Sequence, residues 1–105
     1  MTQMNQVMLR GRLAAAAEER ELPSGDRVVS FRVVVPREAG ARRRSRQKID
    51  SIECSAWTAR LRRTVARLKP GDEVAVCGQL RRTFRRNGVG TASFVTVDLD
   101  SCERL

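Results

Sequence analysis

Hydrophobic and polar residues alternate along much of this chain with a period of two, which is typical of half-buried β-strands. In residues 5–13, for example, Val7, Leu9 and Leu13 fall on one face and Arg10 falls on the other. The same alternation predicts four further strands. They are residues 27–35, 48–57, 73–80 and 92–99.

One segment has a different period and predicts a helix. Between residues 58 and 68, Leu61, Val65 and Leu68 are spaced as one stripe of an α-helix. Thr58 is a suitable N-cap, and the Pro-Gly pair at residues 70–71 stops the helix. We therefore expect one short helix between the third and fourth strands.

The segments between these elements predict turns and loops. Residues 22–26 contain Pro, Ser, Gly and Asp, which is a turn composition, and the alanine-rich, acidic residues 14–21 predict a loop or a strand end. Residues 81–91 are rich in Arg, Asn and Gly and predict the loop between the last two strands. Pro36 ends the second strand, because proline cannot donate a ladder hydrogen bond.

The order of the elements predicts an all-β fold, a five-stranded OB-fold barrel with one short helix between strands 3 and 4. SH3-like barrels also have five strands, and the position of the helix favours the OB barrel over them. Residues 1–105 show no internal repeat and predict a single domain. OB barrels bind oligonucleotides over strands 2 and 3, between the loops that join strands 1 to 2 and 4 to 5.

The charge supports a polyanionic ligand. Among 105 residues, 21 are basic and 12 acidic, which gives a formal net charge of +9. Basic residues gather in two clusters, one on the loop between strands 2 and 3 and one on the loop between strands 4 and 5. The first cluster is Arg42, Arg43, Arg44, Arg46 and Lys48, and the second is Arg81, Arg82, Arg85 and Arg86. Each cluster by itself also fits a solvated loop, whereas two clusters in one small domain favour a shared anionic ligand.

Further candidate contacts lie on strands and among the few aromatic residues. Arg10, Arg12 and Arg32 project from strand faces opposite the apolar ones, where they either contact phosphates or are simply solvated. Trp57 and Phe84 are the candidates for stacking on bases, with core or hairpin packing as their alternatives. Of the other two aromatics, Phe31 is assigned to the core, and Phe94 either to the core or to a subunit contact.

The composition excludes several classes of function. The chain has no histidine, so it lacks Ser-His and Cys-His pairs, and we expect no enzyme, catalytic residue or cofactor. Cys54, Cys77 and Cys102 form no Cys-x-x-Cys pair, so the two within strands, Cys54 and Cys77, are expected to be small hydrophobic residues rather than metal ligands. No apolar run is long enough for a membrane span and no secretory signal is recognisable, which predicts a cytoplasmic, nucleoid-associated protein.

In its motifs the chain resembles bacterial single-stranded DNA-binding proteins, collinearly over residues 5–99. The matching pieces are Asn5-x-Val7-x-Leu9-x-Gly11-Arg12-Leu13, Pro23-Ser24-Gly25, Cys54-x-Ala56-Trp57 and Leu68-Lys69-Pro70-Gly71-Asp72-x-Val74-x-Val76-x-Gly78-x-Leu80. The resemblance implies an OB-fold that assembles as a homo-oligomer, with a tetramer favoured and a dimer as the alternative. It also implies sequence-independent binding of single-stranded DNA in replication, recombination or repair.

The resemblance also identifies stacking positions, and this chain keeps only part of them. Trp57 matches one, and Phe84 lies within one position of another. Ala39 and Ser51 stand where the family has aromatic residues. Each lost stack is worth about 1–3 kcal/mol, so we expect a more electrostatic binder than is usual in the family. With roughly five phosphates neutralised, the logarithm of the binding constant should fall against the logarithm of salt with a slope near −3.5.

The family typically continues into a flexible segment with an acidic tip that recruits other proteins. The sequence ends at Leu105, so either such a tail has been cut off or the chain is a short member without one, and no tail-mediated partner is assigned. Two alternative functions remain open. One is a primosome-like OB accessory protein that acts mainly through protein partners, and the other is an RNA-binding OB protein.

Overall fold

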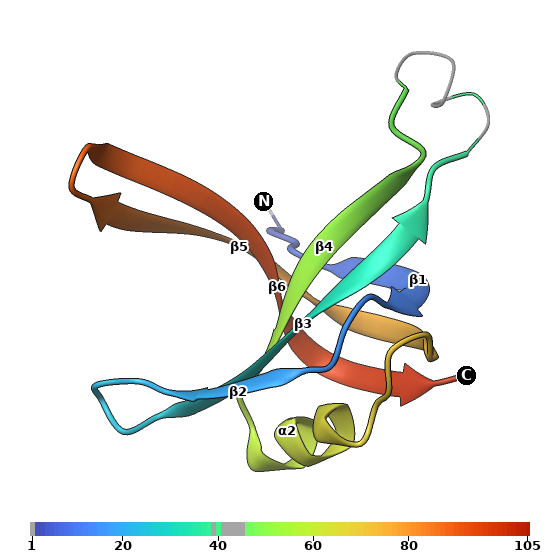
Figure 1. The fold of residues 1–105 in the computed structure, drawn as a ribbon, viewed down its shortest axis with the longest axis horizontal. Coiled ribbons are helices and arrows are strands. Elements are labelled where there is room, and N and C mark those ends of the chain that lie inside the picture. Colours follow the sequence, from blue (N-terminus) through green and yellow to red (C-terminus); the bar gives the residue numbers. More distant parts are fainter. Residues whose placement is uncertain (1, 39, 41–45) are drawn as a thin grey trace.

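In the described part of the chain, six strands and one helix follow one another (Figure 1). A computed structural model describes residues 2–38, 40 and 46–105, with only the backbone of residues 85 and 87. The elements are β1 (Val7–Leu13), β2 (Glu18–Glu21), β3 (Arg27–Pro36), β4 (Ile49–Ala56), α2 (Ala59–Ala66), β5 (Glu73–Asn87) and β6 (Gly90–Arg104).

Five of these strands close into a barrel. The sheet order is β1-β5-β6-β4-β3-β2, and β1 also pairs with β3 through Arg12 and Leu13, which closes the ring. The β4–β6 pairing is parallel and the other pairings are antiparallel. The arrangement confirms the predicted OB barrel, with the helix between its third and fourth strands.

The apolar face of the predicted strands forms the core, as the alternation requires, except at Leu80 and Val95, which are 46% and 52% exposed. Phe31 is only 4% exposed, which confirms its assignment to the core. The helix covers one end of the barrel (Figure 1) and buries Leu61 and Val65 there. Its N-cap is Thr58, whose hydroxyl accepts a hydrogen bond of 3.2 Å from the backbone N–H of Leu61, as predicted.

The prediction of a loop over residues 81–91 is wrong. Strands β5 and β6 continue past the barrel as a long two-stranded ribbon, paired in register from Leu80 and Val97 as far as Asn87 and Gly90. Figure 1 shows this ribbon projecting away from the barrel. Both faces of a projecting ribbon meet solvent, so its strands need no apolar alternation, and their polar sequence resembles that of a loop.

Two smaller predictions also change. Residues 18–21, expected as a loop or strand end, form the edge strand β2, whose four exposed residues pair with β3 from Glu18–Ser30 to Glu21–Arg27. Its side chains are all polar, which is why the hydrophobic pattern did not identify it. Phe94 lies outside the core, because 42% of its surface is exposed.

The three cysteines are free thiols. Cys54 lies in the hydrophobic core, and Cys102 packs against it. Cys54 is fully buried in the core, and its burial raises the pKa of the thiol to about 12. Burial also raises the pKa of Cys102, which packs against the core from β6. A buried thiol that keeps its proton is a poor nucleophile.

We therefore expect Cys54 to be the slowest cysteine to alkylate. An unfolded cysteine ionises near pH 8.5, whereas folded Cys54 keeps its proton until about pH 12. The stability that burial of the Cys54 thiol contributes is therefore fully present below about pH 8.5. It is lost as the pH rises from about 8.5 to about 12, because the unfolded chain releases the proton first. Mass-spectrometric labelling at pH 9 should modify Cys77 first and Cys54 only in denaturant. Equal labelling rates for the two thiols would contradict this.

Candidate nucleic-acid interface

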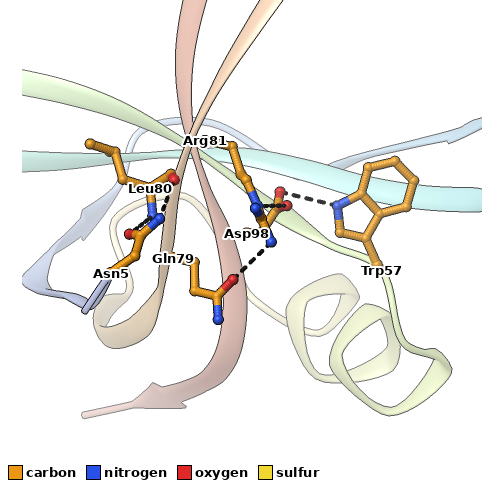
Figure 2. Close-up of polar contacts among 6 residues, drawn as sticks. All are labelled: Asn5, Trp57, Gln79, Leu80, Arg81 and Asp98. Atoms are coloured by element: carbon orange, nitrogen blue, oxygen red, sulfur yellow. Dashed lines mark hydrogen bonds and ion pairs between the residues drawn. The ribbon is translucent and has the colours of Figure 1, made fainter. Parts of the chain in front are cut away.

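Trp57 lies at the end of β4, immediately before the N-cap of the helix. Its side chain is outside the core, with 41% of its surface exposed. The indole N–H donates a hydrogen bond of 3.2 Å to Oδ1 of Asp98 on β6 (Figure 2). One edge of the ring is thus fixed while the ring stays accessible, as base stacking requires.

Asp98 holds a second candidate residue beside Trp57. Its Oδ2 accepts a hydrogen bond of 3.2 Å from Nε of Arg81, whose Nη2 donates in turn to Oε1 of Gln79 at 2.8 Å. Figure 2 shows Arg81 and Trp57 on either side of the Asp98 carboxylate. The arginine is therefore oriented, and its charge is partly compensated before any ligand binds.

Beside Trp57, the outer face of the barrel is hollowed into a groove. Side chains from five strands line it. They are Arg20 and Leu22, near the end of β2, Val28 and Ser30 of β3, Glu53 and Ser55 of β4, Thr83 of β5, and Thr96 and Asp98 of β6. A second hollow, lined by Ala14, Glu18, Arg32 and Ser51 among others, shares Ser30 and Glu53 with the first. The two hollows are neighbours, because they share these two lining residues, and we call them together the Trp57 groove.

The charge of the Trp57 groove is mixed. Arg32 lies opposite Glu53 in the β3–β4 register, and Arg20 lies opposite Val28 in the β2–β3 register. Arg20 was not predicted, because its segment was interpreted as an acidic loop. Only the pairing of β2 with β3 shows that alternate residues of this acidic segment face the groove.

The groove also shows where the chain lacks a stacking residue. Ser51, one of the two positions at which the family has an aromatic, lines the hollow beside Arg32. The other position, Ala39, lies outside the described residues. In the described part of the groove, Trp57 therefore supplies the stacking surface.

Phe84 faces away from the Trp57 groove. Along β5, Arg81 and Thr83 share the outer face with Asp98, so the side chains of Arg82, Phe84 and Arg86 alternate onto the opposite face of the ribbon. Phe84 is 65% exposed, and the guanidinium of Arg82 lies 5.8 Å from its ring centroid, in cation–π contact. Phe84 thus lies on the face of the β5–β6 ribbon that points away from Trp57, the other predicted stacking residue.

The remaining predicted arginines and the lysine are distributed over several places. Arg10 and Arg12 are exposed on β1 outside the groove, where Arg10 forms an ion pair with Glu73 at 3.5 Å and Arg12 donates to the carbonyl of Gly71. Arg46 and Lys48 are exposed just before β4. Arg42, Arg43 and Arg44 lie outside the described residues, as does the side chain of Arg85, whose backbone belongs to β5.

A bidentate ion pair braces the base of the loop that carries the first cluster. Nε and Nη2 of Arg37 donate to the two carboxylate oxygens of Asp50 at 3.0 and 2.8 Å. These hydrogen bonds hold the pKa of Asp50 below its usual range and raise the pKa of Arg37. Arg37 therefore has a structural role, because it joins the end of β3 to the start of β4.

Two other features are absent from the described residues. No group of three His, Cys, Asp or Glu side chains there is placed to hold a metal ion. In the same part of the chain, no helix is long and apolar enough to cross a membrane.

Comparisons with known proteins agree with this geometry. Residues 4–102 match the Single-strand binding protein family. No curated protein sequence matches the chain significantly. Among solved structures, the fold is similar to that of a Plasmodium falciparum SSB in complex with ssDNA. The TM-score is 0.81 at 18% sequence identity, covering 100% of this chain and 96% of that one.

Proposed function

The chain belongs to the single-strand binding protein family, and from this premise we propose that the Trp57 groove is where it binds single-stranded DNA. Proteins of this family bind single strands and are not enzymes, so the function is binding rather than catalysis. The observation that carries the proposal is the exposed indole of Trp57, held at the groove by Asp98 together with Arg81.

A base stacks on the exposed face of Trp57, while the neighbouring phosphates lie near Arg20, Arg32 and Arg81. Stacking suits any base, because every base has a π-face, so the binding is independent of sequence. Arg81 keeps its contact with Asp98 and offers its remaining N–H groups to a phosphate. The carboxylates of Glu53 and Asp98 reduce the net positive charge of the groove, which limits affinity where the chain already lacks two aromatics.

The two basic clusters and the ribbon extend this site. Arg46 and Lys48, which are exposed just before β4, and Arg81 on the ribbon meet phosphates. Arg42, Arg43, Arg44 and Arg85 are proposed as further phosphate contacts on the strength of their charge in the sequence. Arg82, Phe84 and Arg86 meet the strand only where it crosses the edge of the ribbon to the opposite face. Arg10 and Arg12, which lie on β1, contact a bound DNA strand that continues around the barrel.

We propose further that residues 1–105 act as one nucleic-acid-binding unit within a homo-oligomer, with a tetramer favoured. The family and the single-stranded ligand support a role in replication, recombination or repair in the cytoplasm, at the nucleoid. Light scattering with and without oligonucleotide measures the number of subunits. A monomer in both states would contradict the oligomer.

Titration with oligonucleotides tests the proposed function. Trp57 is the only tryptophan and the chain has no tyrosine, so intrinsic fluorescence reports directly on the groove. We expect oligo(dT) to quench this fluorescence. The logarithm of the binding constant should fall against the logarithm of the salt concentration with a slope near −3.5, which is about −0.7 for each of roughly five phosphates. No quenching by oligo(dT) would favour a protein-binding accessory role, and an equal response to oligo(rU) would favour RNA binding.

A further inference from the structure

The exposed side of helix α2 carries a row of arginines that the Trp57 groove does not use. Arg60, Arg63 and Arg67 are exposed, and their spacing of three and four residues places them on one stripe of the helix. The opposite stripe contains Leu61 and Val65, which are buried against the barrel. We call the exposed row the arginine ridge.

The stability of the helix explains only part of the arginine ridge. Arg63 in the last turn and the C-cap Arg67 are favoured by the negative end of the helix dipole, whereas Arg60 is not. Residues 58–69 include five basic side chains and no acidic one. Like charges three and four residues apart repel, and Arg60 lies in the first turn, at the positive end of the helix dipole. Within the described residues, no ion pair within 4 Å joins an acidic side chain to the ridge. A bound polyanion would relieve both kinds of repulsion.

The arginine ridge begins close to the stacking residue. Trp57 immediately precedes the N-cap Thr58, so the first ridge arginine, Arg60, follows Trp57 by three residues. The chain therefore passes from the Trp57 groove directly into the first turn of the helix. A DNA strand that leaves Trp57 toward the helix meets the arginine ridge next.

The β2–β3 hairpin holds the helix beside the groove. Nη1 of Arg62 donates a hydrogen bond of 3.1 Å to the carbonyl of Arg27 at the start of β3. A further hollow, lined by Arg27, Arg62 and Arg63 among others, lies between the hairpin and the helix. Glu19, the acidic residue in that hollow, forms an ion pair with Arg27 at 3.6 Å.

We infer that the arginine ridge is a second phosphate-binding surface, which takes the DNA strand as it leaves the Trp57 groove. The inference rests on the proposed function and extends it. At 1.5 Å per residue, the ridge is about 10 Å long. With one phosphate about every 3.4 Å in a stacked strand, it faces about three phosphates. An oligonucleotide just long enough to fill the Trp57 groove would not reach it.

The test compares the whole chain with the triple variant R60Q/R63Q/R67Q on two oligo(dT) lengths. The short one is the shortest that quenches Trp57 fully, and the long one has about six nucleotides more. Three fewer phosphate contacts make the salt slope for the long oligonucleotide shallower by about 2, at 0.7 per contact. At about 0.1 M salt this corresponds to binding up to about 100-fold weaker, and the difference vanishes near 1 M. The short oligonucleotide should bind both proteins equally.

The variant R60K/R63K/R67K is the matched control, since it keeps the charge and should keep the salt slope. Glutamine has a helix propensity close to that of arginine, and a thermal melt checks that the helix remains folded. If the unmodified chain binds both oligonucleotides and the glutamine variant shows the same salt slope on the long one, the inference is wrong and the proposed function stands. Equal weakening on both lengths also overturns it, because the ridge would then act only as a general charge. If the unmodified chain binds neither oligonucleotide, the proposed function fails and the inference fails with it.

Discussion

Replacing Trp57 by alanine should weaken the binding of oligo(dT) about 5- to 150-fold, which corresponds to the 1–3 kcal/mol that one base–aromatic stack contributes. The effect should be near the upper end of this range, because Ser51 and Ala39 supply no further stacking surface. The fold should persist, since Trp57 lies outside the core and 41% of its surface is exposed. Since the variant has no tryptophan, the affinity is measured by fluorescence anisotropy of a labelled oligonucleotide.

Two controls separate stacking from other effects of this change. Trp57→Phe keeps an aromatic face and loses only the hydrogen bond to Asp98, so it should retain most of the affinity. Phe84→Ala removes the aromatic on the opposite face of the ribbon, so an oligonucleotide that fills only the Trp57 groove should bind it normally. An unfolded Trp57→Ala variant would mean that the indole is needed for the barrel. Unchanged affinity in a folded variant would remove Trp57 from the interface.

Gly78→Ala should lower the free energy of unfolding by about 3 kcal/mol, the upper part of the range for added bulk in a tightly packed site. At Gly78, strand β5 passes so close to β6 that an added Cβ would collide with the backbone carbonyl of Asp98. This carbonyl belongs to the barrel itself and cannot turn aside as a flexible side chain can. Equilibrium unfolding in urea measures the loss.

The same substitution should also disturb the interface, because Asp98 orients both Trp57 and Arg81. We therefore expect weaker oligonucleotide binding from the fraction of Gly78→Ala that remains folded. Gly88→Ala is the matched control: no neighbouring atom lies within 4 Å of a Cβ there, so its stability should change by less than about 0.5 kcal/mol. Equal stability of the two alanine variants would show that β5 and β6 can separate at Gly78 without cost.

The sequence alone determined the barrel and its core, for a physical reason. One face of each barrel strand must be buried and the other left in water, so apolar and polar residues alternate along β1, β3 and β4, and the sequence shows this alternation directly. The helix was equally clear, because Leu61, Val65 and Leu68 must meet the core together and Thr58 must cap their helix. These signals are local, and neighbouring residues suffice to show them.

Only the tertiary structure decided which polar residues lie together. Strand β2 and the outer part of the β5–β6 ribbon bury little surface, so no hydrophobic period marks them. Residues 14–21 were expected as a loop or a strand end, and residues 81–91 as a loop. Their pairing brings Arg20 into the groove and places Phe84 on the face opposite to Trp57. The contact of Trp57 with Asp98 spans 41 residues of sequence. Such a contact depends on strand register, and register is set by the whole barrel rather than by any one segment.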